Sequence, residues 1–289
     1  MKNIVTIIIF IVVFNNCTPP TNPLDQWAVG TSSRNAGELQ SIADNGLTCI
    51  EVGWPGSNRQ SIEETEAWAK EIKAAADKAG VDIWSIHIPF GGIYDISQVD
   101  EEARQRAVAV NAVDIELSAR LLNPKYLVIH ASAEPIAAEE REARMASSRK
   151  SLQELAGLAS ACNGVLLVEV LPRSCLGNTS TELLRIIDGI GNTAICFDVN
   201  HLLKESHSAF IQNTKGKIMS THISDYDGLD EKHWLPGKGV IDWTALLKDL
   251  VAVGYTGPFM FEVTRGNPPE ITIEDLAQCW EKLKAEVIK

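Results

Sequence analysis

Eight short apolar runs, rich in Val, Ile and aromatic residues, recur along the sequence and alternate with longer segments of helical character. Apolar runs separated by helices are typical of parallel strands whose two faces are both covered. The expected strands are Trp27–Gly30, Cys49–Trp54, Asp82–Pro89, Tyr126–Ala131, Leu166–Leu171, Ala194–Val199, Ile218–Ile223 and Phe259–Val263. Eight such units in a chain of 289 residues match the α/β class and the (β/α)8 TIM barrel in number and length.

Five of the intervening segments have apolar residues near the 3.6-residue period of a helix. They are Ser61–Ala79, Glu102–Leu122, Glu139–Ala161, Trp243–Val253 and Ile273–Val287. A doubly wound open sheet is the alternative, but no GxGxxG motif follows the first expected strand. The even spacing favours a closed barrel, and nothing between residues 27 and 289 indicates a second domain. We therefore expect a single-domain TIM barrel over residues 27–289.

The first 17 residues have the pattern of an export signal. Lys2 precedes a mostly apolar run, Ile4–Phe14, which would rise only about 16 Å as a helix and cannot cross a hydrocarbon core of about 30 Å. Cys17 resembles the lipidated first residue of bacterial lipoproteins, although Asn16 stands where a small residue is usual. A plain signal peptide or a short uncleaved anchor are the alternatives. We expect an exported, periplasmic or membrane-anchored protein, with residues 18–26 as a linker and Cys17 as its only membrane contact.

Composition limits the classes of partner. Lys and Arg number 26 against 38 Asp and Glu, so the formal net charge is −12. An acidic surface repels phosphate backbones, and we expect no nucleic-acid partner. The cysteines after Cys17 are widely spaced without a CxxC motif, which argues against a disulfide framework or a Cys-rich zinc site. Cys49 and Cys196 lie inside apolar runs and are predicted to be core residues.

Ionisable residues follow the apolar runs at the same place in the second to eighth units. They are Glu51, His87, His130, Glu169, Asp198 with His201, His222 with Asp225, and Glu262. In a TIM barrel these strand ends meet at one mouth, where active sites are built. Taken singly, each residue also fits a structural hydrogen bond, a helix cap or an ion pair. Crowded carboxylates are costly unless a cation compensates them, so the joint pattern predicts a metal site.

These strand ends resemble the xylose isomerase-like superfamily, which includes sugar phosphate isomerases/epimerases, ketose 3-epimerases, hydroxypyruvate isomerase and endonuclease IV. The motifs are Ser85-Ile-His87-Ile-Pro-Phe, Glu169-Val-Leu-Pro-Arg173, Asp198-Val-Asn-His201, His222-Ile-Ser-Asp225, the segment His233–Trp243 and Phe261-Glu262-Val. For the epimerase branch, the resemblance implies one divalent cation held by Glu169, Asp198, His222 and Glu262. It also implies that Glu169 and Glu262 move the proton and that His201 contacts substrate. Three oxygen donors and one imidazole suit Mn²⁺, Co²⁺, Mg²⁺ or Zn²⁺.

Glu51, His87, His130 and His233 are further candidates for substrate contact, with structural hydrogen bonding as the alternative. The implied activity is a sugar isomerase or epimerase that abstracts a proton next to a carbonyl through an enediolate. Export favours an unphosphorylated sugar or a keto-sugar as the small-molecule substrate. If the enolate expels a β-oxygen group, the same site is a lyase or dehydratase. The sequence does not indicate an oligomeric state.

Two further hypotheses remain open. Endonuclease IV, a multi-zinc phosphodiesterase, has nine ligands with similar positions here. They are His87, His130, Glu169, Asp198, His201, His222, Glu231, His233 and Glu262. Glu231 departs from the Asp of that enzyme, and the acidic charge opposes DNA binding. The other hypothesis is a non-catalytic sugar-binding protein whose metal only braces the barrel.

Overall fold

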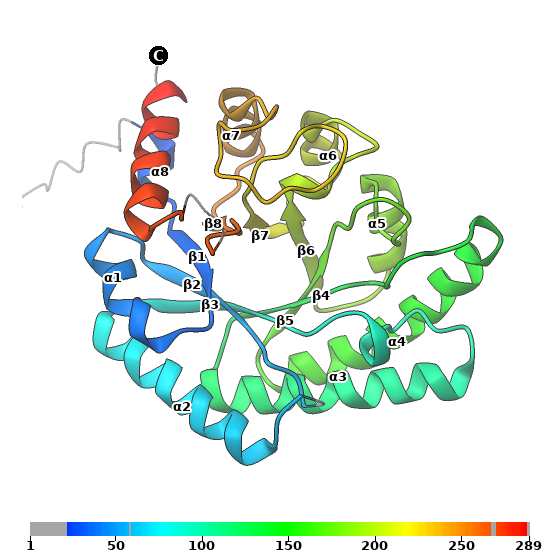
Figure 1. Cartoon of the computed structure of the whole chain (residues 1–289). Helices are drawn as coiled ribbons and strands as arrows, with labels where there is room; N and C mark the ends of the chain where they lie inside the picture. The colour runs from blue at the N-terminus through cyan, green and yellow to red at the C-terminus, as the bar shows by residue number, and fades with distance from the viewer. Residues whose placement is uncertain (1–21, 58, 267–269, 288–289) are drawn as a thin grey trace, which may run out of the picture.

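The computed structural model describes residues 22–57, 59–266 and 270–287, and it shows helices arranged around a ring of strands (Figure 1). The strands are β1 (Val29–Ser33), β2 (Cys49–Gly53), β3 (Asp82–His87), β4 (Tyr126–Ile129), β5 (Val165–Glu169), β6 (Thr193–Asp198), β7 (Ile218–His222) and β8 (Phe259–Phe261). The helices are α1 (Leu39–Asp44), α2 (Ile62–Ala79), α3 (Glu101–Leu122), α4 (Arg141–Ala161), α5 (Ser180–Ile187), α6 (His207–Asn213), α7 (Trp243–Ala252) and α8 (Ile273–Val287). Short 3-10 helices are η1 (Pro23–Gln26), η2 (Ala36–Glu38), η3 (Gly92–Tyr94), η4 (Ala138–Glu140) and η5 (Val199–His201).

The strands form one parallel sheet in the order β7-β6-β5-β4-β3-β2-β1-β8. The sheet closes where the chain leaves β7, because Ile223 bridges to Phe261, the last residue of β8. The Ile223 N–H donates to the Met260 carbonyl at 2.8 Å, and the Glu262 N–H donates to the Ile223 carbonyl at 3.0 Å. The predicted single (β/α)8 TIM barrel is therefore confirmed.

Local sequence signals explain where most long elements begin and end. Helix α2 starts at a capping box, in which Ser61 and Glu64 satisfy each other's backbone N–H groups, and it ends at Gly80 with φ of 70°. Strand β1 differs most from its prediction, because it runs three residues past Gly30. Thr31 and Ser33 are polar but buried, and they pair with Ile50 and Val52 of β2. A strand that continues through small polar residues is invisible to a search for apolar runs.

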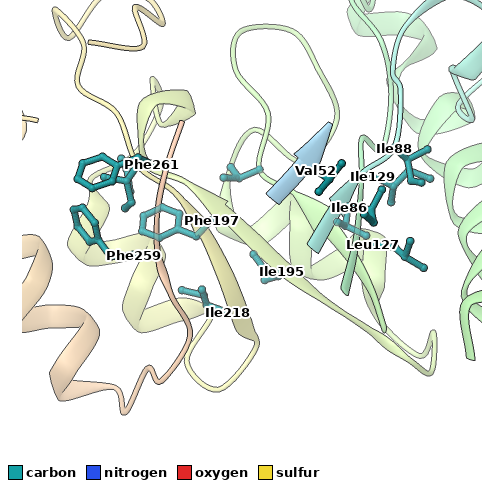
Figure 2. Packing of buried hydrophobic residues seen from close by; sticks show 14 of the residues in the cluster. Val52, Ile86, Ile88, Leu127, Ile129, Ile195, Phe197, Ile218, Phe259 and Phe261 are labelled. Atoms are coloured by element: carbon teal, nitrogen blue, oxygen red, sulfur yellow. The ribbon is translucent and has the colours of Figure 1, made fainter. Parts of the chain in front are cut away.

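Two apolar layers hold the barrel. The larger one lies between strands and helices and contains Val52, Ile86, Leu127 and Phe197, among other residues (Figure 2). The smaller one fills the barrel interior and consists of Tyr126, Val128, Leu167, Ala194 and Cys196. Buried side chains of this size each contribute about 1.5–3 kcal/mol. The predicted core positions Cys49 and Cys196 are both buried.

The interior layer also positions the ionisable residues. Side chains alternate between the two faces of a strand, so residues two positions apart share a face. Two residues beyond Val128, Leu167 and Cys196 of the interior cluster stand His130, Glu169 and Asp198, respectively. The apolar interior thus ends in a layer of ionisable groups at the barrel mouth.

The expected export signal of residues 1–17, including Cys17, lies outside the described residues. Within the segment expected as a linker, residues 23–26 form η1, and the Asn22 side chain accepts a hydrogen bond from the Leu24 N–H. Leu24 is 1% exposed and belongs to the larger core layer. Packing therefore begins by residue 22. Within the described residues, each helix is too short or too polar to cross a bilayer.

Candidate metal centre

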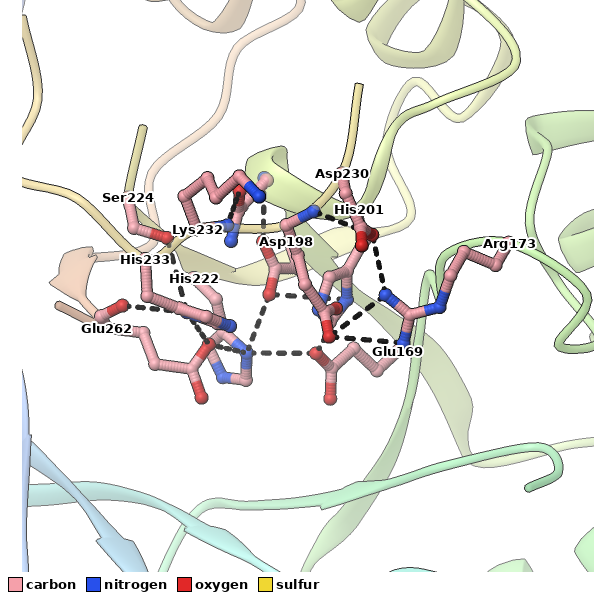
Figure 3. Close-up of polar contacts among 12 residues, drawn as sticks. Glu169, Arg173, Asp198, His201, His222, Ser224, Asp230, Lys232, His233 and Glu262 are labelled. Carbon is pink, nitrogen blue, oxygen red and sulfur yellow. Dashed lines mark hydrogen bonds and ion pairs between the residues drawn. The ribbon is translucent and has the colours of Figure 1, made fainter. Parts of the chain in front are cut away.

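Four strand ends bring together the side chains predicted as cation ligands (Figure 3). Glu169, Asp198 and His222 are the last residues of β5, β6 and β7, and Glu262 directly follows β8. Each offers one ligand atom, and these atoms all lie within 4.8 Å of one another. The Nδ1 atom of His222 lies 3.2 Å from Glu169 Oε1, 3.3 Å from Glu262 Oε2 and 4.0 Å from Asp198 Oδ2. One imidazole nitrogen therefore faces three carboxylates.

The donor set fits a divalent cation. Asp198 Oδ2 and Glu262 Oε2 are buried, and neither accepts a hydrogen bond from any described residue. Burial, together with the charges of Glu262 and Glu169, raises the pKa of Asp198 to about 7, although His201 opposes this. Buried carboxylate oxygens that accept no hydrogen bond are costly, and a cation bound among them would remove that cost. Three carboxylates and an imidazole suit Mn²⁺, Co²⁺, Mg²⁺ or Zn²⁺.

Glu51 contacts the ring nitrogen of His222 that does not face the other three carboxylates. Its Oε1 is 2.9 Å from His222 Nε2, and Ser85 Oγ donates to its Oε2 at 2.7 Å. A carboxylate on the far nitrogen fixes the orientation of a metal-binding imidazole, here with Nδ1 toward the other three carboxylates. The sequence suggested a substrate contact for Glu51; the structure places its carboxylate, 1% exposed, between two protein partners.

His87 and His130 contact the other side of Glu169. The Nε2 atom of each lies 3.0 Å from Glu169 Oε2, while Glu169 Oε1 faces His222. Burial opposes the charged form of His87, but Glu169 and Glu51 raise its pKa to about 9. Burial lowers the pKa of His130, whose ring stacks on Phe90 at 4.1 Å between centroids. His87, His130 and Glu169 form a second group able to hold a cation.

A further such group consists of Glu51, His87 and His222, and another consists of His201, Glu231 and His233. His201 Nε2 lies 3.1 Å from Glu231 Oε2, and its Nδ1 lies 3.0 Å from the Val170 carbonyl. Burial works against its charged form, but Asp198 and Glu231 raise the pKa of His201 to about 10. Arg173 pairs with Glu231 at 3.1 Å and ties this group to the loop after β5 (Figure 3).

Two cavities open at the mouth. The first is about 300 Å³, and all four histidines expected to contact substrate line it, namely His87, His130, His201 and His233. The second is about 550 Å³, lies toward β1 and β2, and includes Glu51 in its lining. Both are in the size range of small-molecule sites. His87, Phe90 and Glu262 border both cavities, so the two are adjacent.

Two residues that line the second cavity, Arg34 and Arg59, were not singled out from the sequence, and Phe90, which lines both cavities, appeared there only as the end of the motif that starts at Ser85. Arg34 directly follows β1, but the expected first strand ended at Gly30, which hid its position at a strand end. A corrected end for β1 is the signal that would have found it. Arg59 and Phe90 stand in loops, six and three residues beyond β2 and β3, where no periodicity applies.

Comparisons with known proteins agree with this fold. Residues 39–283 match the family described as xylose isomerase-like TIM barrel. An L-ribulose 3-epimerase of Mesorhizobium japonicum is 26% identical over 260 residues, covering 81% of this chain and 86% of that protein. An uncharacterized protein of Methanocaldococcus jannaschii is 25% identical over 234 residues, covering 78% of this chain and 77% of its own.

Solved structures share the fold. A D-tagatose 3-epimerase-like protein superposes with a TM-score of 0.76 at 22% identity, covering 90% of this chain and 98% of that chain. A 3-keto-D-glucoside 4-epimerase from E. coli superposes with a TM-score of 0.69 at 19% identity, covering 90% and 99%.

Proposed function

This chain belongs to the family of xylose isomerase-like TIM barrels, and from that premise we propose that it is a divalent-metal-dependent sugar epimerase or isomerase. The observation that carries the proposal is the set of three carboxylates around His222 Nδ1, two of whose buried oxygens accept no hydrogen bond from a described residue. The names of the relatives support the substrate class, because an L-ribulose 3-epimerase and a D-tagatose 3-epimerase-like protein are among them.

Glu169 and Glu262 are the residues that we expect to move the proton. Glu169 Oε1 and Glu262 Oε2 lie 3.2 and 3.3 Å from His222 Nδ1, and both residues border the first cavity (Figure 3). Although burial favours its protonated form, the neighbouring imidazoles of His222 and His130 hold the pKa of Glu169 well below its ordinary value. It is therefore kept as the carboxylate that a general base requires. A bound cation would supply stabilisation of the negative charge that develops on the substrate oxygens.

The position to which the proton returns decides the product. Removal by one glutamate and return by the other to the opposite face of the same carbon inverts that carbon, which is epimerisation. Return to the neighbouring carbon is isomerisation. Loss of a β-oxygen group from the same enediolate would be a lyase reaction. The expected export, with Cys17 as a lipid anchor, stays part of this proposal, and the proposed substrate is an unphosphorylated sugar or a keto-sugar.

The test is substrate-dependent deuterium incorporation from D₂O at a sugar carbon, with metal content measured on the same sample. Glu169→Gln and Glu262→Gln should lower the exchange rate by about 10³-fold or more, which corresponds to about 4 kcal/mol of barrier. The matched control is Glu142→Gln, an exposed carboxylate paired with Arg185 on the outside of the barrel. Full exchange in both cavity variants would disprove the proton-transfer assignment.

A multi-zinc phosphodiesterase is the second candidate. It is favoured by two of the three additional groups, His87 with His130 and Glu169, and His201 with Glu231 and His233. Glu169 would serve two of the three sites, because its two oxygens face different histidines. Three zinc ions per chain and cleavage of a phosphodiester would support this candidate, whereas one exchangeable cation and C–H exchange support the epimerase. Cation binding with neither reaction would point to the sugar-binding alternative.

A further inference from the structure

The wall of the second cavity is basic on one side, whereas the metal centre is acidic. Three arginines line it on the side of β1 and β2, namely Arg34, Arg59 and Arg265. Because His87, Phe90 and Glu262 border this cavity and the first, a ligand in one reaches toward the other. In a chain with a formal net charge of −12, three arginines thus line the same cavity as Glu51 and Glu262.

Arg265 already has a partner. Its guanidinium donates to both oxygens of Glu38, at 2.9 and 3.0 Å, and to the Ser32 carbonyl at 3.2 Å. Such a two-point pair compensates the positive charge and fixes the guanidinium in place. Arg265 therefore shapes the cavity wall without offering it a free charge.

Among the described residues, neighbours contact the backbone and the aliphatic stem of Arg34 but make no hydrogen bond or ion pair with its guanidinium group. Its backbone carbonyl accepts a hydrogen bond from Trp68 Nε1 at 3.1 Å. Its aliphatic stem crosses Gly53, where an added Cβ would lie 3.2 Å from Arg34 Cδ. Gly53 is the last residue of the regular strand β2, so its backbone does not require a glycine. The absence of a side chain at this position instead leaves space for the stem of Arg34.

The guanidinium groups of Arg34 and Arg59 have no ion-pair or hydrogen-bond partner among the described residues. Partial loss of hydration, and then the nearby charge of Arg59, lowers the pKa of the Arg34 guanidinium, although its side chain is exposed. The positive charges of Arg34 and Arg59 repel each other beside this cavity, and an anion bound between them would offset the repulsion. A guanidinium presents its N–H donors in a planar fork that matches a carboxylate or a phosphate.

We propose that Arg34 and Arg59 form a subsite for an anionic group of the substrate, a carboxylate or a phosphate, while the reacting carbon lies between Glu169 and Glu262. This inference rests on the proposed function and narrows its substrate to an acidic sugar. A sugar acid agrees with the expected exported, unphosphorylated substrate, whereas a sugar phosphate would overturn that expectation.

The first experiment measures binding and needs no turnover. Inorganic phosphate is titrated calorimetrically into the cation-loaded protein and into the Arg34→Gln/Arg59→Gln variant. We expect at least tenfold weaker binding in the variant, with partial recovery in Arg34→Lys, which retains the charge. The matched control is Arg106→Gln, an exposed arginine of α3 paired with Glu102, which should change the affinity less than twofold. Since a bound cation also attracts phosphate, only the difference between variants is diagnostic. Equal affinity in the wild type and the double variant overturns the subsite.

The second experiment identifies the source of the anion. Deuterium exchange is compared for a neutral ketose, a keto-uronate and a ketose phosphate. The double variant should raise the KM of the anionic substrate about tenfold and leave kcat and the neutral ketose nearly unchanged. A preference for the uronate assigns a carboxylate, and a preference for the phosphate ester assigns a phosphate. No preference for either over the neutral ketose overturns the inference.

The outcomes separate the two proposals. Arginine-dependent phosphate binding without exchange on any sugar would leave the subsite standing and remove the epimerase. Deuterium exchange on a neutral ketose that does not change when both arginines are replaced, without arginine-dependent phosphate binding, would leave the epimerase standing and remove the subsite.

Discussion

The two walls of the barrel mouth are built by opposite means. The wall from β5 to β8 carries Glu169, Asp198, His222 and Glu262, which are largely buried and stand at or next to regular strands. The wall at β1 and β2 carries Arg34 and Arg59, which are exposed and stand in loops. The first wall collects negative charge that needs a cation, and the second collects positive charge that needs an anion. A substrate with a carbonyl at one end and an acid at the other would be aligned by both.

The largest effect should follow a change in the acidic wall. Asp198→Asn removes one predicted ligand without changing its volume, so cation content and deuterium exchange should both fall, the exchange by about 10³-fold. In metal-free protein the same change should raise the melting temperature, because it removes a buried carboxylate that faces Glu169 and Glu262. Metal analysis and thermal melts with and without the cation check these signs. A lower melting temperature in the metal-free variant would show that the cluster is satisfied without an ion.

Glu51 gives a smaller and more specific effect. Glu51→Gln keeps the shape but weakens the hold on His222 Nε2, so cation affinity should fall about 10–100-fold. Exchange should recover at high cation concentration, since no expected ligand is lost. A competition titration with a chelator measures the affinity. Loss of exchange that excess cation does not restore would mean that Glu51 acts on substrate directly.

The acidic wall could be anticipated from sequence because regular strands impose order on it. An apolar run followed by one ionisable residue recurs in β2 to β8, and parallel strands bring those ends to one mouth. The contact of Glu51 with His222 could not be anticipated, because β2 and β7 meet only across a closed barrel. Closure is a property of the whole sheet and leaves no local pattern.

The basic wall could not be predicted from the sequence, for a different reason. The end of β1 is made of Thr31, Ser32 and Ser33, and pairing with β2 rather than apolar character makes them a strand. Arg34 was therefore not placed at a strand end. The sequence also did not predict the short helices α1, α5 and α6, because six to eight residues are too few to show a helical period.

The pair between Glu38 and Arg265 allows the basic wall to be strengthened. Glu38→Gln should free Arg265 and tighten inorganic phosphate binding about threefold, at a stability cost of about 0.5–1 kcal/mol. Although burial opposes it, hydrogen bonds from Arg265 and Ser33 lower the pKa of Glu38. The pair therefore contributes stability above the ordinary carboxyl pKa, and this contribution is lost as the pH falls through the lowered folded-state pKa. Urea unfolding across that acidic range should show this loss in the wild type and not in the variant. Unchanged phosphate affinity would mean that Arg265 does not reach the anion.

The smallest effect concerns the space under Arg34. Gly53→Ala adds a methyl group 3.2 Å from Arg34 Cδ, so the stem must shift by a few tenths of an ångström while the backbone of β2 stays as it is. We expect phosphate binding to weaken about twofold, with cation affinity unchanged, because the metal centre lies on the other wall. Gly157→Ala is the matched control, since an added Cβ there meets nothing within 4 Å. If Gly53→Ala leaves phosphate binding unchanged but weakens the cation, the two walls are not separable, and the arginines act through the metal centre rather than on an anion of their own.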